Sequence, residues 1–270
     1  MGRGNGKAYL RPPIAFCFNL SIWIGIGIGI GLSGVAKRKS LQQPAAAWWF
    51  ANMAAIKGPG THRLLVEGEK DLRVLPYLME KNGVAWERDK EPVQIIPLGG
   101  ITKFSKADAS SELKSSELKF LGIILDADQN ANAAWETIQG WFADSFIDMP
   151  PQIPAHGFIS SVNRDGIRFG AWIMPDNMSV GMLETFLKWL VRDDHQELWS
   201  FAEKSCTEAK SLYNAPYKHV HQDKASIHTF LAWQDEPGPQ LHEAFRNSAL
   251  DPKSPASQPF VKWFRELFQV

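Results

Sequence analysis

Two short apolar runs, each ending abruptly in carboxylates, constrain the fold of this chain more than any other feature. The first is Leu64-Leu65-Val66, followed by Glu67-Gly68-Glu69-Lys70-Asp71, and the second is Phe120–Leu125, followed by Asp126-Ala127-Asp128. This pattern is typical of a buried strand that surfaces at the edge of a parallel sheet, where α/β folds place their chemistry. Carboxylates gathered there are costly unless something positive neutralises them, and a hard divalent cation such as Mg²⁺ is the usual answer.

Length and composition limit the class of protein to which this chain can belong. The 270 residues suffice for one large or two modest domains, and 44% hydrophobic with 21% charged residues is ordinary for a soluble globular protein. The formal net charge of zero excludes a global field that attracts nucleic acid or an anionic membrane, so any nucleic-acid contact needs a local basic patch or a partner. The two cysteines, Cys17 and Cys206, indicate neither a disulfide framework nor a CxxC zinc site, and they fit a reducing cytoplasm.

The N-terminal segment differs from the rest. Residues 12–36 carry no charge and contain an alternating Ile-Gly block at 24–31. The segment is long enough for a membrane span of roughly 20 residues, and its basic flank also fits a signal peptide. A low-complexity extension ahead of a true start near Met53 is the third interpretation. The Ile-Gly alternation favours it, because each glycine costs about 1 kcal/mol in a helix interior. We expect a cytoplasmic protein, with membrane anchoring through residues 14–36 as the alternative.

From residue 63 onward the pattern is that of an α/β fold. Strands are expected at 63–67, 93–97, 119–125 and 168–174; helices at 70–82, 130–142 and 182–192; and a loop with part of a helix at 110–116. Strands that alternate with helices predict a mostly parallel sheet flanked by helices. The predicted organisation is an N-terminal extension over 1–57, an α/β domain over 58–195 and a mainly helical region over 196–270 that packs on it.

The acidic strand ends resemble the Toprim domain over about residues 62–192. A glutamate closes the first strand in a Val66-Glu67-Gly68-x-x-Asp71 context, and a later strand ends in Asp126-x-Asp128. More closely, the chain resembles the DUF3226-type bacterial proteins; the cues are the segments 173–177, 181–184 and 224–234. The resemblance implies a Toprim-like, Rossmann-like sheet that cuts or joins phosphodiesters with Mg²⁺ or Mn²⁺.

Three carboxylates take the central roles that the resemblance implies. Asp126 and Asp128 would hold the metal, since side chains two residues apart converge as the strand opens into a loop. Glu67 would be a metal ligand or the general acid/base on the opposite loop. The competing interpretation makes Asp126 and Asp128 a turn and an N-cap before the helix expected at 130–142.

Further site residues follow from the same resemblance. Asp71 resembles the second acidic residue of the overcoming-lysogenization-defect (OLD) nucleases, and Glu184 resembles their late glutamate, which completes a second metal site. Alternatively, Glu67 and Asp71 are a helix-start pair favoured by the macrodipole, and Glu184 is a solvated first-turn residue. Lys224 would neutralise a scissile phosphate or else lies on the surface, and Asp176 is a weaker ligand candidate that also fits a plain turn.

Other polar groups are interpreted as structural. Glu69 and Lys70 are expected to be exposed, and the Gly99-Gly100 turn with Lys103 is weak evidence for a phosphate site. A zinc site is rejected because no cysteine or acidic partner stands at ligand spacing from His219-x-His221. A zinc role is rejected for His228 and His242 as well.

Departures from the wider family narrow the expected function. Nothing here supplies the tyrosine domain of a topoisomerase, the zinc module of a primase or a Gly-x-x-x-x-Gly-Lys-Ser/Thr loop. The resemblance therefore implies a Mg²⁺-dependent nuclease acting on DNA or RNA. By analogy with OLD-type nucleases, it would be the effector of a phage-defence or repair system with a separately encoded ABC-type ATPase. The alternative is a non-catalytic Toprim module that binds a partner protein.

Overall fold

The apolar runs that end in carboxylates form neighbouring strands of one sheet. The computed structural model describes residues 60–87 and 89–270, so the predictions for residues 1–57 lie outside the described part. The strands are β1 (His62–Val66), β2 (Gln94–Pro97), β3 (Phe120–Asp126), β4 (Phe158–Ile159) and β5 (Arg168–Met174), in the spatial order β2-β1-β3-β5-β4. All neighbours are parallel except β4, which pairs antiparallel with β5 at one edge. The predicted α/β fold with a mostly parallel sheet is confirmed.

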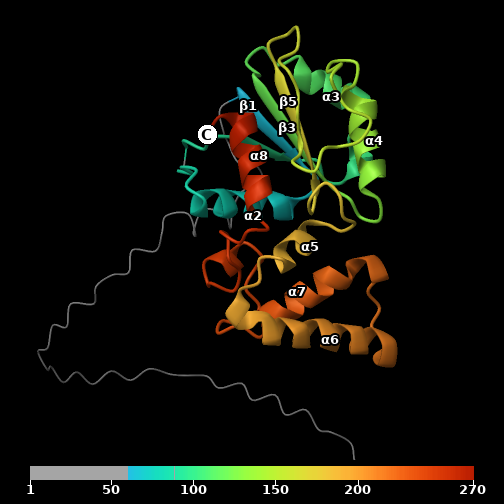
Figure 1. Cartoon of the computed structure of the whole chain (residues 1–270), viewed down its shortest axis with the longest axis vertical. Helices are drawn as coiled ribbons and strands as arrows, with labels where there is room; N and C mark the ends of the chain where they lie inside the picture. Colours follow the sequence, from blue (N-terminus) through green and yellow to red (C-terminus); the bar gives the residue numbers. More distant parts are fainter. Residues whose placement is uncertain (1–59, 88) are drawn as a thin grey trace, which may run out of the picture. The chain divides into compact units, whose positions relative to one another are not determined.

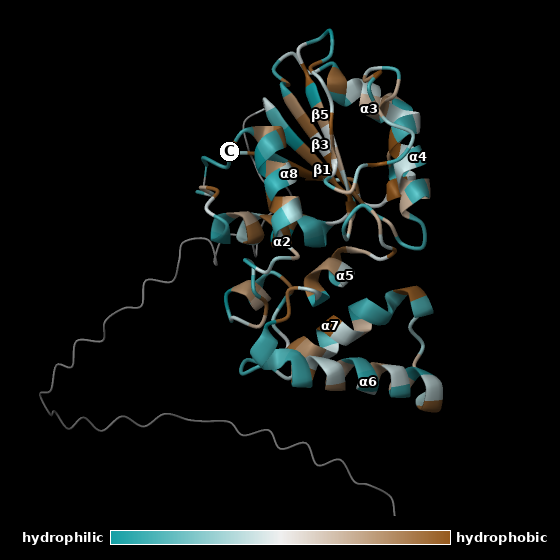
Figure 2. Cartoon of the chain, viewed as in Figure 1, coloured by the Kyte–Doolittle hydropathy of each residue, from teal (hydrophilic) through white to brown (hydrophobic). Residues whose placement is uncertain are grey.

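Helices cover both faces of this sheet (Figure 1). One face packs against α3 (Lys106–Leu113) and α4 (Ala131–Phe142), and the other against α2 (Glu69–Lys81) and α8 (Gln258–Phe268). Side chains along β5 alternate accordingly: Ala171 and Ile173 belong to the first core, and Trp172 and Met174 to the second. Because both faces are covered, the central strands are hydrophobic along their length (Figure 2).

A pair of glycines lets the C-terminal helix α8 lie close on the sheet. Gly122 of β3 and Gly170 of β5 are register partners. A Cβ atom on Gly170 would stand 2.6 Å from Leu267 Cδ2, and one on Gly122 would stand 3.0 Å from Phe268 Cζ. The last turn of α8 therefore occupies the space that two side chains would otherwise fill, and the C-terminal region contributes directly to the core of the sheet.

The remaining C-terminal helices pack beside the carboxyl ends of the strands. Helix α6 (Gln196–Tyr213) packs on α7 (Gln222–Ala232), and α7 packs on the short helix α5 (Leu183–Lys188) that follows β5 (Figure 1). Short 3-10 turns complete the chain: η2 (Ile101–Lys103), η3 (Asp193–His195), η4 (His219–His221) and η5 (Glu243–Phe245).

Three elements differ from the sequence-based expectation. Helix α3 begins at Lys106, earlier than expected, because Ser105 and Asp108 form a capping box at its start. Strand β4 has only two residues, too few for a period-2 signal. Helix α5 ends at Lys188 because Val191 leaves the helical path to pair with Leu250. Among the described residues, no helix combines the length and the apolar character needed to cross a bilayer.

The glycine pair yields a stability prediction. Replacing Gly170 by alanine forces its new methyl group against Leu267, so we expect Gly170→Ala to lower the free energy of unfolding by about 1–3 kcal/mol. Gly140→Ala in α4 is the control: its Cβ meets nothing within 4 Å, and a helical alanine should stabilise by up to about 1 kcal/mol. Urea denaturation measures both. Equal stability of the Gly170→Ala and wild-type proteins would contradict this packing of α8.

Candidate metal centre at the carboxyl edge of the sheet

Glu67 and Asp126 meet at the carboxyl edge because β1 and β3 are adjacent parallel strands. The backbone N–H of Asp126 donates to Glu67 Oε2 at 3.2 Å. Asp126 Oδ1 in turn accepts from the backbone N–H of Leu183 at 3.0 Å, where α5 begins. Three segments that are far apart in sequence are thus joined through two carboxylates.

Asp71 lies in the first turn of α2 and is 6% exposed. Its Oδ2 accepts from the backbone N–H of Gly68 at 3.1 Å, which caps the helix. The interpretation of Asp71 as a helix-start residue is therefore correct, but it does not explain why the side chain is buried. Capping alone does not require burial, and here the capping carboxylate faces the same pocket as Asp126.

Glu184 lies in the first turn of α5 and is 3% exposed, so the solvated first-turn alternative is wrong. Lys70 Nζ donates to Glu184 Oε1 at 2.8 Å, and Lys224 Nζ lies 3.6 Å from the same oxygen. Lys224 thus comes to the predicted site. Lys70, which was expected to be exposed, is a member of the site that sequence reasoning missed; its side chain is 44% exposed, but its ammonium group faces Glu184.

These four carboxylates and two lysines line one pocket of about 280 Å³. The Gly99-Gly100 turn forms another part of its wall, and both glycines adopt positive φ, 72° and 110°, which favours glycine. The weak phosphate-site motif therefore lies beside the acidic cluster.

Burial and electrostatic repulsion both disfavour negative charge on the aspartates of this pocket. Burial, together with the charges of Asp71, Glu67 and Glu184, raises the pKa of Asp126 well above its usual value. Burial, then the charges of Glu184 and Glu67, raises the pKa of Asp71 to about 7, although the Gly68 N–H opposes the change. Both groups therefore hold protons more firmly than ordinary aspartates do.

The two glutamates respond in opposite directions. Burial raises the pKa of Glu67, with a further contribution from the charge of Asp128, and the Asp126 N–H partly offsets both. Burial acts on the pKa of Glu184 in the same sense, but the hydrogen bond and charge of Lys70 and the charge of Lys224 outweigh it, so this pKa is lowered.

The second aspartate of the Asp-x-Asp pair is placed differently from the first. Asp128 is exposed, has φ +49°, and forms a backbone bridge with Gly181. The N-cap of α4 is Asn130, not Asp128. Asp176 accepts from the backbone of Met178 and Ser179, which is the turn role.

The carboxylates of the pocket offer oxygen donors, which a hard cation prefers. Within residues 60–87 and 89–270, no three His, Cys, Asp or Glu side chains form a preassembled metal site. The chemistry nonetheless fits Mg²⁺: the donors are carboxylate oxygens, and the raised pKa values of Asp71 and Asp126 mean that their ionised forms are disfavoured and that a bound cation would favour them. Side-chain rotation would be needed for these oxygens to converge on one ion.

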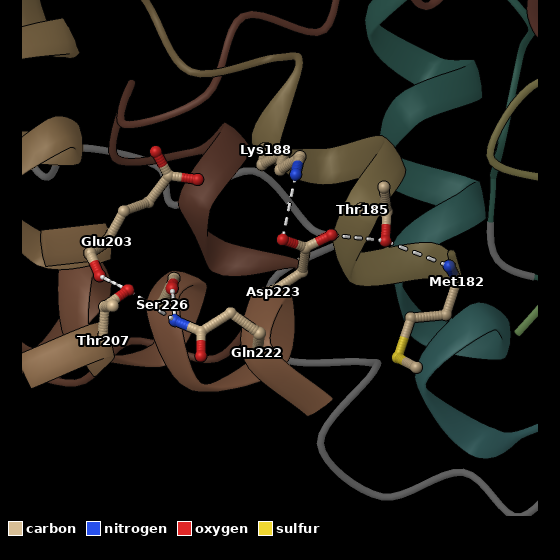
Figure 3. A network of polar contacts seen from close by, with 8 residues as sticks. All are labelled: Met182, Thr185, Lys188, Glu203, Thr207, Gln222, Asp223 and Ser226. Atoms are coloured by element: carbon tan, nitrogen blue, oxygen red, sulfur yellow. Dashed lines mark hydrogen bonds and ion pairs between the residues drawn. The ribbon is translucent and has the colours of Figure 1, made fainter. Parts of the chain in front are cut away.

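A clamp of hydrogen bonds joins α5 to α7 (Figure 3). The Thr185 hydroxyl donates to Asp223 Oδ2 at 2.7 Å and accepts from the Met182 N–H at 3.1 Å, while Lys188 Nζ donates to Asp223 Oδ1 at 2.9 Å. Since Thr185 follows Glu184 and Asp223 precedes Lys224, the clamp fixes the two helices at the point where Lys224 approaches Glu184.

Fold and site together define a class: an α/β protein whose parallel sheet carries buried carboxylates flanked by lysines at its carboxyl edge. Among protein families, the profile of the one described as "Protein of unknown function (DUF3226)" matches residues 61–269. The chain belongs to this family. No curated protein matches the chain, and no solved structure matches it.

The raised pKa of Asp71 predicts a pH effect on stability. Between about pH 4 and pH 7 the folded state binds more protons than the unfolded state, so this group lowers the free energy of unfolding as pH rises. Without divalent metal, Asp71→Asn should therefore stabilise the protein at pH 8 by roughly 1–3 kcal/mol and much less at pH 4. Urea denaturation at both pH values measures the difference.

Asp108→Asn provides the matched control for this prediction. Asp108 holds the same capping-box position in α3, but the hydrogen bonds from Ser105 lower its pKa and it lies on the surface. Its replacement should not stabilise the protein at pH 8. If Asp71→Asn behaves as Asp108→Asn does, the cost assigned to the charge of Asp71 in this pocket is absent.

The clamp is tested by Thr185→Val. This change keeps the shape of a buried side chain but leaves an Asp223 oxygen and the Met182 N–H without their Thr185 partner, so we expect a loss of about 1–3 kcal/mol in urea denaturation. Thr207→Val in α6, where the hydroxyl is exposed, should cost much less. Thr185→Ser, which keeps the hydroxyl, should retain most of the wild-type free energy of unfolding. If Thr185→Val unfolds at the same urea concentration as the wild-type protein, the clamp does not contribute to stability and the prediction is wrong.

Proposed function

We propose that this protein is a Mg²⁺- or Mn²⁺-dependent nuclease of the Toprim type, which hydrolyses phosphodiesters of DNA or RNA. The observation that carries the proposal is the meeting of four carboxylates from β1, α2, β3 and α5 with two lysines in one pocket: Glu67, Asp71, Asp126, Glu184, Lys70 and Lys224. A merely structural cluster would not need to bury uncompensated negative charge at the sheet edge where α/β proteins bind ligands.

The metal would be held first by the carboxylates that lack a lysine partner in the pocket, Asp71 and Asp126, with Glu67 beside them. Asp128 stays a proposed ligand from the exposed turn after β3. Glu184 would complete a second site once it exchanges its lysines for a cation. A bound Mg²⁺ would stabilise the negative charge that develops on the phosphoryl oxygens during hydrolysis.

The chain's own residues supply the remaining functions. Lys70 and Lys224 converge on one oxygen of Glu184, and the same two ammonium groups suit a phosphate as well as a carboxylate. The raised pKa of Glu67 brings this residue closer to the working range of a general acid/base. Glu67 would exchange a proton with the attacking water or the leaving oxygen.

The proposal extends to a partner. The chain has a net charge of zero and no Gly-x-x-x-x-Gly-Lys-Ser/Thr loop of its own, so it has neither a strong general attraction for nucleic acid nor this ATP-binding motif. A separately encoded ABC-type ATPase would supply the attraction for nucleic acid and the ATP-binding site in a defence or repair complex.

Cleavage assays test the proposal. Labelled single-stranded DNA, plasmid and tRNA are incubated with Mg²⁺ or Mn²⁺, and we expect cleavage that EDTA abolishes. Asp126→Asn and Glu67→Gln, which keep shape but remove charge, should each reduce the rate by about 100-fold or more. Asp165→Asn, in the exposed turn before β5 at the opposite edge of the sheet, should leave it unchanged.

Two outcomes would contradict the nuclease proposal. Cleavage that survives both site substitutions would come from a contaminant or another site. Absence of cleavage, together with absence of Mg²⁺ stabilisation in thermal unfolding, would instead favour a non-catalytic module that binds a partner protein.

A further inference from the structure

A second pocket, of about 300 Å³, adjoins the carboxylate pocket. Its walls come from α2, from α7 and from the loop before η5; the residues that matter here are Lys70, Arg73, Val74, His228, Gln240 and Leu241. Lys70 and Glu69 line both pockets. Lys70 therefore stands between the acidic cluster and this second space, which we call the Arg73 pocket.

The charges around the Arg73 pocket are mainly positive. Lys70 and Arg73 line it, Lys224 lies next to Lys70 across Glu184, and Glu69 is the acidic residue of its rim. An anionic chain that places one phosphate at the carboxylate pocket thus finds two cations, Lys70 and Arg73, and one carboxylate, Glu69, on the Arg73 side.

The interior of the Arg73 pocket suits a flat ring. Val74 and Leu241 are buried apolar residues, and the imidazole of His228 lies beside them with Nε2 3.4 Å from Lys70 Nζ. Arg73 Nη1 donates to Gln240 Oε1 at 3.1 Å, so a guanidinium and an amide are held together where they can meet polar ring edges. Apolar and π surfaces with such donors are how proteins hold unstacked bases.

The size of the pocket suits a single base. At about 300 Å³ it lies at the lower end of small-molecule sites. This volume is sufficient for the base of one nucleotide, and a base paired in a duplex would first have to leave its stack to enter the pocket.

We propose that the Arg73 pocket receives the unpaired base next to the phosphate held at the carboxylate pocket, so that the substrate is single-stranded nucleic acid. This inference rests on the proposed nuclease function and names its substrate class. Arg73 and Gln240 are positioning residues in it, since they hold a base and not the reacting phosphate.

Binding without metal separates this inference from catalysis. In EDTA, fluorescence anisotropy follows the full chain binding to a short labelled single strand, as DNA and as RNA, and to the matching duplex. We expect the single strand to bind at least tenfold more tightly than the duplex, a factor of about ten being worth 1.4 kcal/mol. Arg73→Ala should weaken single-strand binding about tenfold, while Arg164→Ala, an exposed arginine in the turn before β5, should not.

An abasic scan tests the pocket itself. Removing one base at a time should reveal a position whose loss weakens wild-type binding at least about fivefold. Gln240→Trp, which fills the pocket from an exposed position, should abolish that penalty. The inference is overturned by equal binding of duplex and single strand, by a scan without any penalty, or by equal effects of Arg73→Ala and Arg164→Ala. A protein that passes these tests yet cleaves nothing contradicts only the nuclease proposal, whereas cleavage without a base penalty contradicts only the pocket.

Discussion

The burial of mutually repelling carboxylates at the carboxyl edge of the sheet is the constraint on which the rest of this structure depends. Asp71 is buried and Asp126 is partly buried, and each carries a raised pKa because of this burial and of the acidic side chains around it. Lys70 and Lys224 offset the charge of Glu184 but leave these two aspartates uncompensated. Burying such charge costs stability, and sites of this kind persist where function requires them.

The scaffold holds these charges together through a few specific contacts. Pairing of β1 with β3 brings Glu67 to the backbone of Asp126, and the Asp126 carboxylate reaches forward to α5. The bond between Asp223 and Thr185 then fixes α7 against α5. On the face of the sheet that α2 also covers, α8 lies in the space left by a pair of glycines. The C-terminal helices thus complete both the core and the site.

Local sequence patterns predicted the strands, because a buried parallel strand is a continuous apolar run, and the same runs located Glu67 and Asp126. Lys70 was missed because its partner, Glu184, is 114 residues away and nothing local reveals that contact. Asp128 has the spacing of a ligand, but a positive φ places it in an exposed turn. The start of α3 carried a readable capping signal in Ser105 and Asp108, whereas the two-residue β4 did not carry any. Membership of the DUF3226 family is confirmed, and the Toprim relationship stays a prediction.

Proton release on Mg²⁺ binding tests the central claim most directly. If the cation is held by Asp71 and Asp126, it must displace the protons that their raised pKa values retain. Calorimetry at about pH 6.5, in buffers of different ionisation enthalpy, should then show release of roughly one proton per Mg²⁺ bound, declining towards pH 9 and lost in Asp126→Asn. Mg²⁺ binding without proton release, or equal binding by Asp126→Asn, would contradict a metal centre at this edge.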